Sequence, residues 1–355
     1  GVNVDYIIYK NASLSYDIPA ITLDQLEEMI LKDISKPFSI IVTANAMWFA
    51  NDMQEILRQK FKDCNVNLFS LIVKFDYKES YIEAKKKELE MLQTQLDVYT
   101  KLEIQLGHTI KKAEVPTYTE KPPKIIWVCW LQGMDNAPSL VQSCYRTLQN
   151  SLPDYEKILI TTENFNQYVD IDPIILGKWK KGIISNTMFS NVLRLELLIK
   201  HGGIWMDSTI LFTGDEMPKF ISDSPLFMYK RRNVNMELKP SGNWFIGSCK
   251  NHILLTATRD LFIQYWHNND ELIHYSLFYF LFRLVVNTYT DLWDKVSCIT
   301  VDAPLVMGEH LTREYDKERF EVLINQSPFH KLTYKLAPTV LENQSNYYNY
   351  IIKNF

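Results

Sequence analysis

The sequence predicts an α/β fold, because strand-like and helix-like segments alternate along most of its 355 residues. In the first part, three apolar runs are separated by two helical patterns, which is the order typical of a parallel sheet. In the second part, a helical segment ends at a glycine pair and passes directly into a short apolar run, 204–206. That run ends in the carboxylate of Asp207, so a polar site is expected at the edge of a sheet.

The composition narrows the class of protein. Hydrophobic residues make up 46% of the chain, which is enough for a sizeable core, and the net charge of −4 argues against general nucleic-acid binding. No apolar run reaches the roughly 18 residues of a membrane span, and no signal peptide is visible. The five cysteines have no paired spacing, so we expect neither disulfides nor a zinc site and predict a cytoplasmic protein.

Residues 1–78 are expected to form a small α/β accessory domain. Its predicted strands are 4–9, 39–43 and 68–75, and its predicted helices begin near residue 24, after a capping box, and at residue 52. No glycine-rich phosphate loop accompanies these segments, so a structural or docking role is favoured over a second enzyme.

A long helix and linker are expected over residues 79–121. Leu92, Tyr99 and Leu106 recur every seven residues, and Leu89 and Leu96 extend the seam. Two interpretations fit this pattern equally. The helix near 85–110 either forms a homodimer or lies along the neighbouring domain as an amphipathic strut.

The third segment, 122–355, carries the motifs. A strand is expected over 125–130, a helix over 137–148 and a strand over 157–161. The helix that begins near residue 190 stops at Gly202 and Gly203, which adopt the left-handed cap without steric cost. The strand after them delivers Asp207, Ser208 and Thr209, whose oxygen atoms are the kind of ligand that hard divalent cations prefer.

At these residues the chain resembles a known family. GGIWMDST is similar to the modified Asp-X-Asp element of glycosyltransferases related to capsular polysaccharide synthesis proteins. Four further segments match in the same order and extend the resemblance over roughly 121–335: PKIIWVCWLQG, APSLVQSC, NWFIGS and HKLTYK.

The resemblance implies a GT-A-like, Rossmann-type domain over 122–355. It also implies a metal-dependent hexosyltransferase that retains the anomeric configuration. The expected donor is a nucleotide sugar, with UDP favoured as the nucleotide. The expected acceptor is a growing polysaccharide or a lipid-linked oligosaccharide, in bacterial capsule or surface polysaccharide synthesis. The implied cofactor is Mn²⁺ or Mg²⁺, bridging the donor's phosphates.

The resemblance also places roles on particular residues. Asp207 and Thr209 are the expected metal ligands, with Thr209 standing where many relatives of the wider fold carry a second aspartate. Arg194 and Asn191 lie one helical turn apart, where the family holds the donor with an arginine and an aspartate. Asn191 therefore departs from the family pattern. The remaining candidates for substrate binding are Trp127, Trp130, Gln132, Asn243, Trp244, His310 and Lys331.

Each candidate has a structural alternative. The tryptophans are equally compatible with an ordinary core, and Arg194 with a structural salt bridge. The neutral Asn191 and the missing second aspartate favour one rival function: a non-catalytic protein, derived from a transferase, that binds glycans or nucleotide sugars. The aromatic, weakly basic end of the chain either docks on the core or makes a peripheral contact with the membrane surface that carries a lipid-linked acceptor.

Overall fold

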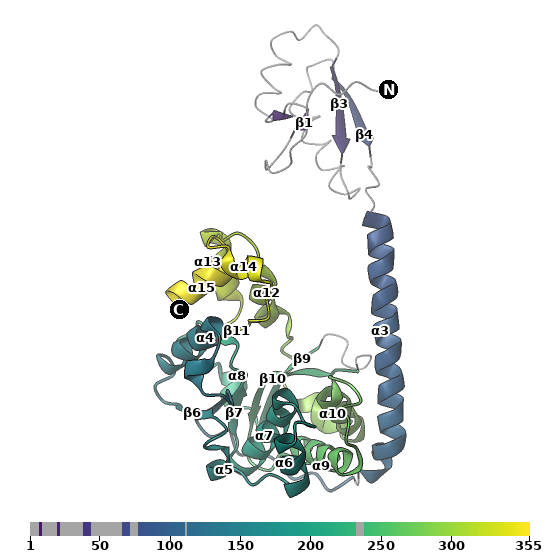
Figure 1. Cartoon of the computed structure of the whole chain (residues 1–355), viewed down its shortest axis with the longest axis vertical. Helices are drawn as coiled ribbons and strands as arrows, with labels where there is room; N and C mark the ends of the chain where they lie inside the picture. Colours follow the sequence, from purple (N-terminus) through teal and green to yellow (C-terminus); the bar gives the residue numbers. More distant parts are fainter. Residues whose placement is uncertain are drawn as a thin grey trace. The chain divides into compact units, whose positions relative to one another are not determined.

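The computed structural model describes residues 77–110, 112–231 and 238–355, together with the backbone of four short strands nearer the N-terminus. The chain divides into two compact units, Gly1–Met91 and Leu92–Phe355. Figure 1 shows both with their element labels. The strands of the first unit form two parallel pairs: β1 (Ile7–Ile8) with β2 (Ala20–Ile21), and β3 (Phe38–Thr43) with β4 (Val66–Leu71).

Parallel pairing is what the alternating pattern of the first unit predicts. The expected strands at 4–9, 39–43 and 68–75 coincide in part with β1, β3 and β4. The helices expected near residues 24 and 52 lie outside the described residues.

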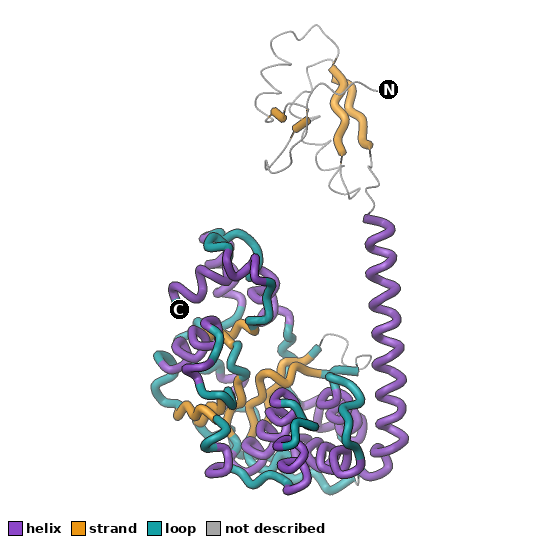
Figure 2. The backbone as a smooth tube through the Cα atoms, in the orientation of Figure 1, coloured by secondary structure: helices purple, strands orange, loops and turns teal. Residues whose placement is uncertain are grey.

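The long helix α3 (Tyr77–Leu106) is continuous through 30 residues (Figure 2). In its second half, Tyr99, Leu102 and Leu106 are buried in the core of the second unit. The Tyr99 hydroxyl also accepts a hydrogen bond from the Asn287 amide at 2.9 Å. This half acts as the predicted strut, so the segment expected at 79–121 is shared between the two units. The exposed leucines nearer its start leave the homodimer a prediction, Leu89 being 68% exposed.

The second unit is built on a five-stranded sheet in the order β6-β5-β7-β10-β9. Strand β5 runs parallel to both of its neighbours, whereas β10 runs antiparallel to β7 and to β9. Four strands therefore point the same way, and the expected α/β class with a mostly parallel sheet is confirmed. The strands are β5 (Ile125–Cys129), β6 (Glu156–Ile160), β7 (Gly203–Met206), β9 (Leu226–Lys230) and β10 (Ser241–Ser248).

Side chains alternate between the two faces of this sheet, as the two-residue period of a strand requires. On one face, Trp127 and Trp205 join the core formed with α7 (Asn186–His201), α9 (Ile253–Asn268) and α10 (Leu277–Thr288). On the other face, Ile204 and Met206 join a second cluster. Because both faces are covered, the strands read as nearly continuous apolar runs in the sequence.

A second, two-stranded sheet pairs β8 (Ile210–Phe212) with β11 (Phe329–Lys331) in antiparallel register, so that Lys331 lies opposite Ile210. A third apolar cluster joins this pair to helices from both ends of the unit. The remaining elements are η1 (Gly107–Thr109), η2 (Met134–Asn136), α4 (Ser139–Gln149), α5 (Phe165–Tyr168), α6 (Pro173–Lys180), α8 (Lys219–Ser222), α11 (Thr290–Lys295), α12 (Asp302–His310), α13 (Lys317–Gln326), α14 (Pro338–Glu342) and α15 (Tyr347–Asn354).

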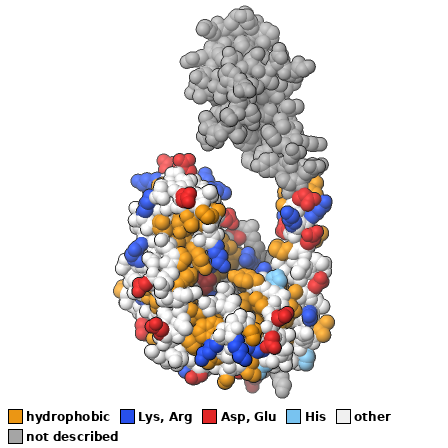
Figure 3. All heavy atoms as spheres, viewed as in Figure 1, with side chains coloured by type: hydrophobic (Ala, Val, Ile, Leu, Met, Phe, Trp, Pro, Cys, Tyr) orange, Lys and Arg blue, Asp and Glu red, His pale blue; other side chains and the backbone are white. Residues whose placement is uncertain are grey.

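Two properties of the surface bear on function. Lysine and arginine side chains lie scattered among apolar and acidic ones on the face shown in Figure 3, rather than in one basic patch. Within the described part of the chain, no helix combines the length and the apolar character that crossing a bilayer requires.

Candidate active site

The turn between α7 and β7 positions the central strand of the sheet, and Asp207 follows the carboxyl end of that strand. Gly202 and Gly203 have φ values of 69° and 96°, which side chains other than glycine rarely adopt. A Cβ on Gly203 would stand 2.6 Å from the carbonyl oxygen of Ile125. The glycine pair therefore lets the chain leave the helix and pass directly into a strand packed against β5. The carboxyl end of that strand holds Asp207, whose amide donates to the Trp244 carbonyl at 2.8 Å.

Asp207 and Arg194 form the central ion pair of the site. Arg194 donates from Nη2 to the Asp207 Oδ1 atom at 3.0 Å, and the Trp205 indole donates to the same oxygen at 2.9 Å. The guanidinium also stacks on the Trp205 ring, 4.7 Å from its centroid. Arg194 is only 3% exposed, and this burial lowers its pKa. The negative charge of Asp207 opposes that shift. The carboxylate thus offsets a charge that water scarcely reaches.

Three polar side chains continue from Arg194 into the protein. The Asn191 Oδ1 atom accepts from Arg194 and from the Asn243 amide, both at 3.0 Å. Asn243 in turn accepts from the Tyr279 hydroxyl at 2.6 Å. Burial raises the Tyr279 pKa to about 12, so its hydroxyl remains a donor at neutral pH. This chain of hydrogen bonds fixes the side chains on the α7 side of the pocket.

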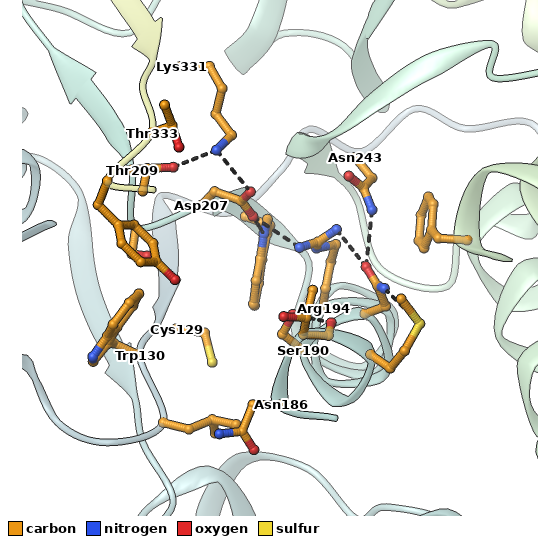
Figure 4. Close-up of a pocket in the computed structure, with 18 of the residues that line it drawn as sticks. Cys129, Trp130, Asn186, Ser190, Arg194, Asp207, Thr209, Asn243, Lys331 and Thr333 are labelled. Atoms are coloured by element: carbon orange, nitrogen blue, oxygen red, sulfur yellow. Dashed lines mark hydrogen bonds and ion pairs between the residues drawn. The ribbon is translucent and has the colours of Figure 1, made fainter. Parts of the chain in front are cut away.

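Lys331 approaches Asp207 from the side opposite Arg194, as Figure 4 shows. Its Nζ atom lies 2.5 Å from the Thr209 hydroxyl and 3.7 Å from the Asp207 Oδ2 atom. The backbone holds this arrangement, because the Leu332 amide donates to the Thr209 carbonyl at 2.9 Å. Asp207 therefore lies between two cations, one on each of its oxygens.

These side chains line a pocket of about 400 Å³ at the carboxyl end of β7. An aromatic pair forms part of its wall: the rings of Trp130 and Tyr334 meet edge to face, with centroids 5.6 Å apart. Among the described residues that line it, the cationic side chains are Arg194, Lys331 and Lys335, and the only carboxylate is Asp207. The excess of two positive charges suits an anionic ligand. Of the residues selected from the sequence, the pocket brings together Trp130, Gln132, Asn191, Arg194, Asp207, Thr209, Asn243 and Lys331.

Three selected residues lie elsewhere. Trp127 is buried and donates from its indole to the Gly202 carbonyl at 2.8 Å. Trp244 stacks on Tyr229 in the core, with centroids 5.0 Å apart. His310 lies near the end of α12, where its ring nitrogens contact the Val306 carbonyl at 2.9 Å and a neighbouring arginine at 3.2 Å. All three have structural surroundings, and none lines the pocket.

Tyr279 and Tyr334 are two of the lining residues that sequence reasoning overlooked. Tyr279 lies on the aromatic helix α10, whose composition resembles an ordinary core helix. Tyr334 lies within HKLTYK, where the lysines drew attention instead. Tyr334 follows Lys331 by only three residues, and both side chains line the same pocket.

The side chains at Asp207 do not match the set that a divalent cation requires. Magnesium binds with near-octahedral oxygen coordination, supplied by carboxylates and water. Here Oδ1 accepts from Arg194 and Trp205, Oδ2 faces Lys331, and the Thr209 hydroxyl accepts from Lys331. In the described part of the chain, no three acidic, histidine or cysteine side chains gather around a common point. As they lie, these side chains fit an ammonium group better than a metal ion.

Among solved structures, the chain is similar to the PaToxG glycosyltransferase, at 15% identity and a TM-score of 0.35 over 75% of this chain and 97% of the other. At that distance the likeness adds nothing on activity. No protein with a curated description matched. The model of the capsular polysaccharide synthesis protein family matches residues 78–351, which include every residue of the pocket. The chain therefore belongs to the capsular polysaccharide synthesis protein family.

Proposed function

We propose that the protein is a glycosyltransferase of the GT-A type. It transfers a hexose from a UDP-sugar to a growing polysaccharide or a lipid-linked glycan, with retention of the anomeric configuration. The observation that carries the proposal is the meeting of Arg194 and Lys331 at Asp207, at the carboxyl end of β7. Open α/β sheets bind their ligands at this edge.

The charge and shape of the pocket support a sugar nucleotide. Its excess of two positive charges complements a diphosphate, and its volume of about 400 Å³ lies within the usual range for small-ligand sites. Trp130 and Tyr334 offer aromatic surface to a base. The oxygens of Asn191 and Asn243 are engaged in internal hydrogen bonds, so only their remaining amide hydrogens are left to donate to sugar hydroxyls.

The residues present favour attack from the face that the diphosphate leaves. A double displacement needs a nucleophile, yet the only carboxylate among the described lining residues, Asp207, is held by Arg194 and Trp205. Burial raises the Cys129 pKa to about 12, which keeps this thiol protonated and unreactive. The bond from the anomeric carbon to the phosphate oxygen breaks with its electron pair on that oxygen. The acceptor oxygen forms the new bond, and its proton passes to the departing phosphate.

The Mn²⁺ or Mg²⁺ expected from the sequence takes no part in this scheme. Arg194 and Lys331 supply positive charge where the leaving group develops negative charge, which is the form of stabilisation that contributes most in many enzymes. We place the reaction in the cytoplasm, at the inner face of the membrane when the acceptor is lipid-linked.

A donor screen tests the proposal. The protein is mixed with a panel of nucleotide sugars, and release of the free nucleoside diphosphate is measured. Asp207→Asn should lower the release at least a hundredfold, because both cations lose the group that positions them. Asp170→Asn is the matched control, since Asp170 is 97% exposed and outside the pocket. Undiminished release by Asp207→Asn would contradict the assignment.

One observation favours a second candidate, a non-catalytic protein that binds nucleotide sugars or glycans. Asn191 is neutral, and its oxygen already accepts two internal hydrogen bonds. Calorimetric titration with UDP, carried out alongside the donor screen, separates the two functions. Binding without turnover of any donor on any acceptor tried would favour the binding protein.

A further inference from the structure

Lys331 occupies a defined position in the pocket. It ends β11, and the antiparallel register places it opposite Ile210. Its side chain is 22% exposed, and its ammonium group contacts both Thr209 and Asp207. These two residues are the oxygen donors that the sequence identifies as metal ligands. The lysine charge therefore stands between the groups expected to hold a cation.

A divalent cation could enter this position only by displacing Lys331. Two like charges at ligand distance repel each other, and the partial exposure of Lys331 and Asp207 screens this repulsion only in part. The main chain beside Lys331 is fixed, because the Leu332 amide donates to the Thr209 carbonyl, so only the flexible lysine side chain could swing aside. A metal ion would also compete for Asp207, which neutralises the buried Arg194. The geometry thus disfavours metal binding for two independent reasons.

We propose that Lys331 replaces the divalent cation, so that donor binding and glycosyl transfer proceed without metal. This inference rests on the proposed function. Lysine binds phosphate as a point charge, and the Lys331 ammonium donates a hydrogen bond to the diphosphate. When the bond from the sugar to the phosphate oxygen breaks, the electron pair stays on that oxygen beside the ammonium group. The acceptor proton then passes to that oxygen, so the step requires no proton from Lys331.

The first test uses the wild-type chain. UDP affinity by calorimetry and diphosphate release from the active donor are measured in EDTA and again in 5 mM Mn²⁺, a concentration chosen as roughly saturating for a typical weak site. We expect both quantities to agree within about twofold, because the ammonium supplies the charge in either case. Loss of binding and release in EDTA would overturn the inference while leaving the transferase intact. Failure to bind or turn over any nucleotide sugar in either buffer would overturn the proposed function and the inference together.

The second test changes the lysine. Lys331→Met should weaken UDP binding about tenfold or more, equivalent to about 1.4 kcal/mol, and slow release further. Lys331→Arg keeps the charge and should restore much of the affinity. Lys317→Met removes an equivalent charge from the exposed face of α13 and is the control for net charge. Wild-type affinity and release by Lys331→Met, in EDTA, would overturn the inference. The wild-type comparison of EDTA with Mn²⁺ decides the question even if Lys331→Met does not fold.

Discussion

Replacing Asp207 with asparagine separates the structural part of this carboxylate from its part in ligand binding. The change keeps the size of the side chain and removes its charge. Arg194, which is 3% exposed, would then lose the carboxylate 3.0 Å from its Nη2 atom. Removing one partner of a buried pair costs about 3–5 kcal/mol, because the other charge stays buried.

Two features of the site reduce that cost. Asp207 is 27% exposed, so water can reach the group that replaces it. The asparagine oxygen can still accept one of the hydrogen bonds now made by Arg194 and Trp205. We therefore expect Asp207→Asn to lower the free energy of unfolding by about 2–3 kcal/mol. For a unit of this size, such a loss lowers the melting temperature by about 4–10 °C.

Thermal unfolding with and without UDP measures both effects. The diphosphate carries the negative charge that the variant lacks, so UDP should raise the melting temperature of Asp207→Asn more than that of the wild type. The control Asp170→Asn disturbs only an exposed pair with Lys200 and should change stability by less than about 1 kcal/mol. The reasoning is refuted if Asp207→Asn melts like the control. It is also refuted if UDP stabilises the wild type but not the variant, because that result makes Asp207 a ligand for a metal–nucleotide complex.

Three further predictions concern other parts of the unit. Burial lowers the His330 pKa to about 4 from about 6.5 when unfolded, so the unfolded chain binds the proton first. The contribution of neutral His330 to the free energy of unfolding is complete above pH 6.5 and falls by about 3 kcal/mol as the pH drops to 4. In urea titrations, the free energy of unfolding of His330→Gln should therefore fall less over this pH range than that of the wild type. Gly203→Ala should lower the free energy of unfolding by at least about 2 kcal/mol in the same titration, because the new Cβ would clash with the Ile125 carbonyl and the residue would keep a positive φ. Trp130→Ala should weaken UDP binding about tenfold in calorimetry, with unchanged pyrophosphate binding, if its ring contacts the base.

The sequence predicted the centre of the fold well because its signals there are local. Helix α7, the glycine stop and strand β7 follow one another within residues 186–206, and each depends on its nearest neighbours. The position of Asp207 at the strand end follows from the same local order. Family resemblance added the surrounding motifs in the correct sequence, and the family model covers the same region.

The orientation of individual side chains was harder to predict. NWFIGS was expected to supply both Asn243 and Trp244 to the sugar pocket, yet successive residues of a strand face opposite sides. Asn243 lines the pocket, and Trp244 turns into the core beside Tyr229. The motif fixes which segment reaches the site. Only the register against β7 fixes which of the two side chains enters it.

Contacts between distant segments carried no sequence signal. Lys331 and Thr209 are separated by 122 positions, and their contact depends on the pairing of β8 with β11. Two residues that read as a phosphate ligand and a metal ligand turn out to touch each other. That contact is what changes the expected chemistry of the site.

Because Asn191 is neutral, it leaves the excess positive charge of the pocket unchanged. Its oxygen accepts from Arg194 and Asn243, whereas its amide nitrogen has only a weak contact, 3.7 Å from the Met188 sulfur. A carboxylate would accept the same two hydrogen bonds, so the geometry admits aspartate equally well. The difference is one charge: aspartate would halve the excess of two positive charges among the described lining residues. Asn191→Asp should therefore keep its fold and bind UDP about tenfold more weakly at low salt, with the difference shrinking as salt screens the charges. Unchanged or tighter binding would show that the neutral amide is not what leaves room for the diphosphate.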